Sequence, residues 1–130
     1  MLVKLFDTTL RDGAQTEGIS FSLEDKLKIT KLIDELGVHY IEGGWPGSNP
    51  KDIEYFRAVR ELKLKQAKIV AFSSTRRPGV KVEDDRNIQT LLAAETPVVC
   101  IFCKNRDLQG SDPLQTTPEE NMANIKENVA

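Results

Sequence analysis

The sequence predicts an α/β fold in which parallel strands alternate with helices. Apolar, β-branched stretches suited to strands begin near positions 2, 38, 68 and 97. A stretch with the apolar spacing of an amphipathic helix follows each of them, so that a strand-helix unit recurs about every 30 residues. Apolar strands that are separated by helices are expected to run parallel and to be covered by those helices.

The expected strands are four short apolar segments, at residues 2–6, 38–42, 68–72 and 97–102. The first helix should start after Ser22, which forms a capping box with Asp25 in place of the usual Glu. Gly37 is a suitable residue to end that helix. The second helix should start with Asn49 as its N-cap and Pro50 at its first position.

A third and a fourth helix are also expected. The third is expected over residues 84–94, where apolar residues recur at helical spacing. The fourth should open with Thr117 as N-cap, Pro118 at the first helical position and Glu120 at the third.

Two architectures fit four such units: an open doubly wound sheet, or the N-terminal half of a (β/α)8 TIM barrel. A complete barrel takes about 250 residues, and this chain of 130 residues would hold about half of one. The sequence also stops at residues 128–130, in or just after a helical pattern and without a capping residue. We therefore expect residues 1–130 to be a truncated, partial TIM-barrel catalytic domain that lacks the later strands.

Composition and charge limit the functional classes. Apolar residues make up 39% and charged residues 29% of the chain, as in soluble globular proteins. The net charge of −2, without a basic run, argues against binding to nucleic acid or to a membrane surface. No apolar run approaches the roughly 18 residues of a membrane span, and the N-terminus enters a strand pattern directly. We therefore expect a cytoplasmic protein.

The cysteines and the histidine are expected to be structural. Cys100 and Cys103 have the C-x-x-C spacing of redox and zinc sites. They lie in a strand-like run, however, where residues three apart point to opposite faces, so buried structural cysteines are the better interpretation. His39 is the only histidine, and no second one completes a metal site.

Polar and charged side chains collect where the expected strands end. Arg11, Asp12 and Gln15 follow the first strand, and Glu42 ends the second. Barrel enzymes place their chemistry at this carboxyl face. Asp12 and Glu42 offer oxygen ligands for a divalent cation, and Arg11 offers a fixed cation for a carboxylate or a developing oxyanion. These groups suit an enolate or alkoxide reaction on a small keto acid, and the alternative is a surface turn with an Arg11–Asp12 salt bridge.

Three motifs carry a resemblance to a known family. Residues 6–15, FDTTLRDGAQ, resemble the signature of the acyl-CoA Claisen-type barrel superfamily, which contains isopropylmalate, homocitrate and citramalate synthases and hydroxymethylglutaryl-CoA lyase. Residues 40–52, YIEGGWPGSNPKD, look like the form found in the (R)-citramalate synthase branch, and residues 71–77, AFSSTRR, are similar to the same branch. The resemblance covers nearly the whole chain to about residue 103.

The resemblance implies a role for each of the four polar residues. Asp12 would be a metal ligand, and the metal would be Mg²⁺, Mn²⁺ or Zn²⁺. Arg11 would be catalytic and substrate-binding, stabilising the negative oxygen that forms as enolised acetyl-CoA attacks the keto carbon. Glu42, also catalytic, and Gln15, also substrate-binding, would help to order the metal and the keto acid. The implied partners are acetyl-CoA and a small 2-oxo acid, in a protein that forms a homo-oligomer.

The same resemblance suggests which 2-oxo acid is used. Synthases that take a second carboxylate need polar or charged groups at the ends of the third and fourth strands. Here these positions fall near Phe72, Ser73, Phe102 and Cys103. Small or apolar residues of this kind suit pyruvate better than 2-oxoglutarate, which implies synthesis of (R)-citramalate and CoA in branched-chain amino-acid biosynthesis.

The sequence departs from the family in two respects. The family's His-x-His metal ligands are absent, so the 130 residues alone should be inactive. The loop at residues 103–110 lacks the expected Trp and His.

The open edges of a half barrel should also promote self-association.

Two other functions remain open from the sequence. One is an enzyme of the 2-isopropylmalate synthase, homocitrate synthase or hydroxymethylglutaryl-CoA lyase type. The other is a non-catalytic half barrel that binds a partner or an anion. An His-x-His on a later strand would favour the enzymes.

Overall fold

The computed structural model describes residues 2–75 and 79–103 of the chain. Within these residues four strands form one sheet: β1 (Phe6–Asp7), β2 (Tyr40–Gly44), β3 (Lys68–Ser74) and β4 (Val98–Phe102). Three α-helices connect them: α1 (Leu23–Glu35), α2 (Pro50–Val59) and α3 (Arg86–Ala93). The expected fourth helix, from Thr117 onward, lies outside the described residues.

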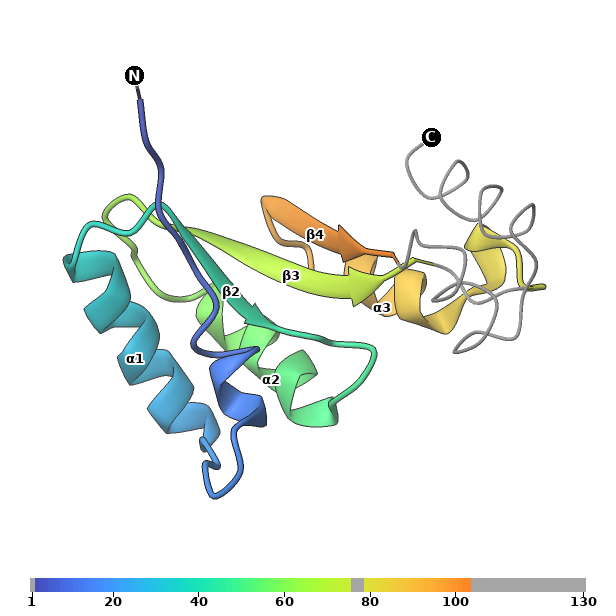
Figure 1. Cartoon of the computed structure of the whole chain (residues 1–130), viewed down its shortest axis with the longest axis horizontal. Coiled ribbons are helices and arrows are strands. Elements are labelled where there is room, and N and C mark those ends of the chain that lie inside the picture. The colour runs from blue at the N-terminus through green and yellow to red at the C-terminus, as the bar shows by residue number, and fades with distance from the viewer. Residues whose placement is uncertain (1, 76–78, 104–130) are drawn as a thin grey trace.

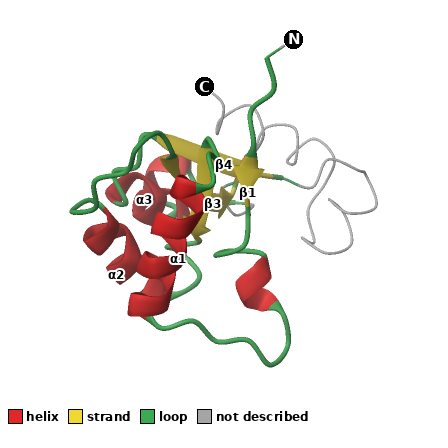
Figure 2. Cartoon of the chain, turned by 90° about the vertical axis from the view of Figure 1, so that its left-hand side faces the viewer, coloured by secondary structure: helices red, strands yellow, loops and turns green. Residues whose placement is uncertain are grey.

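The sheet distinguishes a barrel from a doubly wound fold. The strand order is β1-β2-β3-β4, and every neighbouring pair is parallel. A doubly wound sheet reverses its strand order at a switch point and carries helices on both faces. Here the order follows the chain, and the helices lie together on one side of the sheet (Figure 2). The described residues therefore have the architecture of the N-terminal half of a TIM barrel.

The hydrophobic core lies between the helices and this covered face. α1 packs against α2, both contact β2, and α3 contacts β3 (Figure 1). The largest fully buried side chains of the core come from α2, β2, α3 and the loop after β1: Tyr55, Phe56, Leu10, Ile41 and Leu91. On β3, Ile69 and Ala71 belong to the same core cluster. Val70, between them, and Phe72, the next residue after Ala71, are directed to the opposite face, because side chains alternate along a strand.

The predicted starts of the first two helices are confirmed. The Ser22 hydroxyl accepts a hydrogen bond from the Asp25 amide, and the Asp25 carboxylate accepts one from the Ser22 amide, which completes the capping box before α1. Asn49 caps α2 through the amide of Lys51, with Pro50 at the first turn. The third helix begins later than predicted, because Asp85 is its N-cap and α3 starts at Arg86.

The first strand is shorter than the sequence predicts. Residues 2–6 were expected to form it, but β1 comprises only Phe6 and Asp7. Phe6 already pairs with Tyr40, the first residue of β2, so residues before Phe6 have no strand beside them to continue the ladder. Leu5 still accepts hydrogen bonds from the amides of His39 and Tyr40. The His39 side chain in turn accepts from the Leu5 amide at 2.9 Å, which gives this histidine a structural contact.

The cysteines correct another expectation. Both Cys100 and Cys103 are free thiols and only half-buried, whereas buried cysteines were expected. β4 is the last strand of the described sheet, and three other residues of this strand, Val99, Ile101 and Phe102, are exposed.

In the described part of the chain, no helix is long and apolar enough to cross a membrane.

Candidate functional site

The loop after β1 is folded so that Arg11 turns towards the sheet. The amides of Arg11, Asp12 and Gly13 all donate to the carbonyl of Thr8, which closes a tight turn. Leu10, which precedes Arg11, is fully buried and anchors the loop in the core. The alternation of a buried apolar anchor with charged neighbours explains why the sequence turns polar so abruptly at this point.

Arg11 makes its strongest contact with Glu42. Its Nε lies 2.5 Å from Glu42 Oε1, and the Glu42 side chain is only 1% exposed. A carboxylate buried to this extent requires a charged partner, because an unpaired charge is costly to bury. The Arg11 guanidinium also lies over the ring of Phe72 on β3, with 4.1 Å from Cζ to the ring centroid. The structure thus brings together the two residues that the sequence placed on separate strand ends.

Asp12 is a much weaker partner of Arg11. Its Oδ1 is 3.8 Å from Arg11 Nη1, and its side chain is 65% exposed, against 20% for Arg11. The Arg11–Asp12 salt bridge considered from the sequence is therefore secondary to the Arg11–Glu42 pair. The Asp12 carboxylate faces solvent and is available to a ligand.

Glu42 also receives a contact from the fourth strand. Burial raises the pKa of the Cys100 thiol, and the charge of Glu42 and a hydrogen bond to it raise this pKa further. Arg11, Glu42, Phe72 and Cys100 thus come from four successive βα units and meet on the face of the sheet away from the helices. This is the inner face of the half barrel.

Gln15 lines a cavity next to Arg11. The cavity measures about 260 Å³ and lies between the loops that follow β1 and β2. Its walls come from both loops and from the first turn of α2: Leu10, Arg11, Ala14, Gln15, Trp45, Ser48, Asn49 and Asp52. The predicted substrate-binding residues Arg11 and Gln15 therefore share one cavity, which is large enough for a small organic acid.

The described residues fit a divalent cation only as part of a ligand set. Asp12 offers an exposed carboxylate, whereas Oε1 of Glu42 is already occupied by Arg11. Within residues 2–75 and 79–103, no three side chains of His, Cys, Asp or Glu converge to hold a metal. Mg²⁺ or Mn²⁺ takes about six ligands, so Asp12 would supply one of several.

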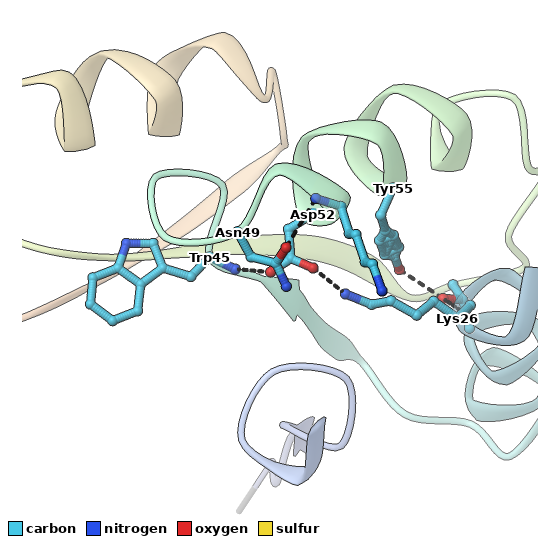
Figure 3. A network of polar contacts seen from close by, with 7 residues as sticks. Lys26, Trp45, Asn49, Asp52 and Tyr55 are labelled. Atoms are coloured by element: carbon cyan, nitrogen blue, oxygen red, sulfur yellow. Dashed lines mark hydrogen bonds and ion pairs between the residues drawn. The ribbon is translucent and has the colours of Figure 1, made fainter. Parts of the chain in front are cut away.

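A buried ion pair supports the loop after β2 and was missed by the sequence analysis. Lys26 on α1 and Asp52 on α2 are 5% and 8% exposed, and Nζ lies 2.7 Å from Oδ1. Oδ2 of Asp52 accepts a hydrogen bond from the Trp45 amide at 2.9 Å (Figure 3). A Cβ on Gly44 would lie 2.5 Å from the Asp52 carboxylate, so only glycine fits there. The pair therefore fixes the point at which the chain leaves β2.

Tyr55 extends this pair into the core. The Lys26 ammonium lies 4.7 Å from the centre of the Tyr55 ring, and the Tyr55 hydroxyl is 2.7 Å from Thr30 Oγ1 (Figure 3). Burial raises the pKa of Tyr55 to about 12. The sequence did contain a signal for this cluster, because Lys26 and Asp52 fall on the apolar faces of their helices, where charged residues are rare.

Comparisons with known proteins agree with this geometry. The family described as HMGL-like matches residues 2–130. The chain is 54% identical to the (R)-citramalate synthase of Aquifex aeolicus over 98% of its length, and 55% identical to that of Synechocystis over 97%. Its identity to the 2-isopropylmalate synthase of Staphylococcus carnosus is 33% over 98%. In each case the chain spans about a quarter of the length of the relative.

Solved structures show the same fold. The hydroxymethylglutaryl-CoA lyase of Bacillus subtilis superposes with a TM-score of 0.68 at 18% identity, and the match covers 98% of this chain and 41% of that one. The lyase of Pseudomonas aeruginosa gives a TM-score of 0.69 at 17% identity, covering 95% and 39%. These likenesses extend over less than half of each lyase, as expected for the N-terminal part of a barrel.

Proposed function

The chain belongs to the HMGL-like family, and on that premise we propose that it is the first part of an enzyme that condenses acetyl-CoA with pyruvate. Water then hydrolyses the thioester, and the products are (R)-citramalate and CoA. The observation that carries this proposal is the Arg11–Glu42 pair on the inner face of a half barrel, in a chain 54% identical to an (R)-citramalate synthase. The identity of 33% to a 2-isopropylmalate synthase makes that alternative weaker.

Arg11 is the residue that stabilises negative charge. Glu42 binds its Nε, which leaves the terminal amino groups of the guanidinium for substrate. Arg11 borders the cavity that Gln15 also lines. The oxygen that becomes negative during condensation would be held there, and removing one such donor typically costs about 100-fold in kcat.

Glu42 orients Arg11 and compensates its charge. Its burial, together with the Phe72 ring against the guanidinium, removes water from one side of Arg11. A charge in such an environment acts more strongly on a bound anion than it does in water.

Asp12 would hold a divalent metal together with ligands from outside the described residues. Such a metal, when bound, polarises the keto group of the 2-oxo acid. Because the described residues offer one free carboxylate for this purpose, the 130-residue chain by itself should not catalyse the reaction. Release of CoA by the purified chain from acetyl-CoA and pyruvate would refute that statement.

The substrate preference follows from Phe72. Of the positions considered for the second carboxylate, Phe72 lies directly beside Arg11, whereas Ser73 is buried with its hydroxyl bonded to the Ser74 carbonyl. Phe72 packs against Arg11 and offers no polar group to a second carboxylate, which favours pyruvate over 2-oxoglutarate.

The exposed edges of the sheet, at β1 and β4, are suited to contacts with later strands or with a second copy of the chain. Leu2, Val3 and Leu5 beside β1, and Val99 and Phe102 on β4, are apolar and exposed. In the proposed enzyme, later strands of the barrel or a second copy of the chain would cover them.

A chimera tests the function directly. Residues 2–130 replace the matching quarter of the Aquifex aeolicus (R)-citramalate synthase, and CoA release from acetyl-CoA is measured with pyruvate, 2-oxoglutarate or 3-methyl-2-oxobutanoate. We expect pyruvate to give the highest kcat/KM. A higher value with 2-oxoglutarate would contradict the pyruvate proposal, and an inactive but folded chimera would contradict the function itself.

A further inference from the structure

Asn87 connects two consecutive βα units at the site, the one that begins with β2 and the one that begins with β3. Its side-chain oxygen accepts a hydrogen bond from the Trp45 indole Nε1 at 3.0 Å, and its side-chain nitrogen donates to Ser74 Oγ at 2.9 Å. Asn87 itself lies in the first turn of α3, where its amide donates to the carboxylate of Asp85 at 2.8 Å. The loop after β2, the end of β3 and the start of α3 are thus linked through one side chain.

The loop after β2 is shaped to reach Asn87. A Cβ on Gly47 would lie 2.0 Å from Asn87 Oδ1, so the backbone at this position can approach only without a side chain. At the other end of the same loop, the Trp45 amide is held by Asp52 (Figure 3). Trp45 is therefore fixed both through its backbone and through its indole ring.

The indole ring transmits this restraint to Arg11. The Trp45 and Phe72 rings make an edge-to-face contact, with 5.1 Å between centroids and an interplanar angle of 78°. The Arg11 guanidinium lies over Phe72 at 4.1 Å. Asn87, Trp45, Phe72 and Arg11 thus form a continuous series of contacts from α3 to the candidate catalytic cation.

We propose that Asn87 is a positioning residue that fixes Trp45 against Phe72 and so sets the orientation of Arg11. Its importance for turnover rests on the proposed function, but its effect on the side chains of Trp45 and Arg11 does not. Asn87 acts through other residues and is not itself in contact with the cavity that Arg11 and Gln15 share.

The experiment uses NMR of the 130-residue chain and the variants Asn87→Ala and Asn87→Asp. Trp45 is the only tryptophan, so the spectrum contains one indole N–H resonance to follow. In Asn87→Ala the indole proton should exchange with solvent about fivefold faster, because its acceptor is lost. The Arg11 Nε–H resonance should shift as well. Asn87→Asp keeps an oxygen acceptor and should restore both signals.

Asp34→Ala is the matched control for a general loss of stability. It should leave the native indole and Arg11 signals in place, because Asp34 lies at the opposite end of the sheet and bonds to residues 65–67. Unchanged indole exchange in Asn87→Ala, failure of Asn87→Asp to restore it, or an unmoved Arg11 resonance would each overturn the proposal.

The chimera separates this inference from the proposed function. If the proposed function holds, Asn87→Ala in the chimera should lower kcat more than it raises KM, and Asn87→Asp should recover the loss. If the chimera is inactive while the NMR changes occur as stated, the function fails and the positioning role stands. If the chimera is active and Asn87→Ala changes neither the NMR signals nor kcat, the positioning role fails alone.

Discussion

Asp34 and Asp52 are two buried helical aspartates that hold opposite ends of the sheet by different means. Asp34 on α1 accepts hydrogen bonds from three backbone amides, those of Lys65, Gln66 and Ala67, at 2.6, 3.1 and 2.9 Å. These amides lead into the amino end of β3. Asp52 on α2 accepts from one amide, that of Trp45, and is neutralised by the ammonium of Lys26 at the carboxyl end of β2.

The difference lies in how each end of the sheet stabilises a buried carboxylate. Backbone amides are neutral, are fixed by the turn and fully satisfy Asp34 without a second buried charge. The pairs Lys26–Asp52 and Arg11–Glu42 each hold a buried carboxylate against a cation that has lost much of its contact with water, which costs desolvation energy. Both pairs lie at the carboxyl end of the sheet, where barrel enzymes place their chemistry, and the proposed function gives the Arg11–Glu42 pair a role there beyond stability.

Removing the ammonium of Lys26 should cause the largest loss in the free energy of unfolding. Lys26→Met leaves the Asp52 carboxylate buried with the Trp45 amide as its remaining donor. An unpaired buried charge costs about 3–5 kcal/mol, and urea unfolding measures the loss in the free energy of unfolding.

Lys28→Met is the control for this prediction, because Lys28 lies on the same helix in an exposed pair with Glu24. Exposed pairs contribute at most about 1 kcal/mol, so the control should lose less than that. The double variant Lys26→Met/Asp52→Leu should recover at least half of the stability lost in Lys26→Met. Equal losses in Lys26→Met and Lys28→Met would remove the distinction between buried and exposed pairs.

Asp34→Ala should have the next largest effect. It leaves three backbone amides without their acceptor, at about 1 kcal/mol each, so we expect a loss of about 2–3 kcal/mol in urea unfolding. Glu35→Ala, an exposed neighbour on the same helix, should change stability by less than about 0.5 kcal/mol. A loss below 1 kcal/mol in Asp34→Ala would show that the turn finds other acceptors.

The pH dependence sharpens the same comparison. Burial acts to raise the pKa of Asp34, but the amides of Lys65, Ala67 and Gln66 together outweigh it and lower the pKa below 3.8. A depressed folded pKa stabilises the fold above the unfolded value of 3.8, and this contribution disappears as the pH falls through the folded pKa. The wild-type chain should lose stability steeply below pH 3.8, and Asp34→Ala should show a shallower slope in urea titrations there. Parallel slopes would contradict the assignment.

The smallest expected effect concerns the thiol beside Glu42. Burial and the Glu42 carboxylate raise the pKa of Cys100, which lowers its thiolate fraction at pH 8. In a Cys103→Ser variant, Cys100 should therefore react with iodoacetamide several times more slowly in the folded chain than in urea. Equal rates would place Cys100 away from the buried carboxylate.

The fold could be predicted from the sequence because its signals are local. The capping box of Ser22 and Asp25 and the Asn49–Pro50 helix start depend on neighbouring residues, and both are confirmed. The predicted length of β1 was wrong, because the length of this strand depends on where β2 begins, in a segment more than 30 residues away.

The site was predicted only in part, for the same reason. The residue types of Arg11 and Glu42 indicated chemistry, but the 2.5 Å contact between them depends on the parallel pairing of β1 and β2. Lys26 and Asn87 were missed altogether, because Asp52 and Trp45, with which they pair, lie in other βα units and only the tertiary structure brings them together.

One comparison in the chimera tests most directly whether Arg11 at the carboxyl end serves chemistry while Asp34 at the amino end serves stability alone. We would measure kcat/KM for pyruvate and the free energy of unfolding in Arg11→Lys and Asp34→Ala. Arg11→Lys should lower kcat/KM by about 100-fold, whereas Asp34→Ala should lower stability by about 2–3 kcal/mol and leave kcat/KM within about twofold of the parent. An equal loss of kcat/KM in both variants, or a larger one in Asp34→Ala, would contradict this division of roles.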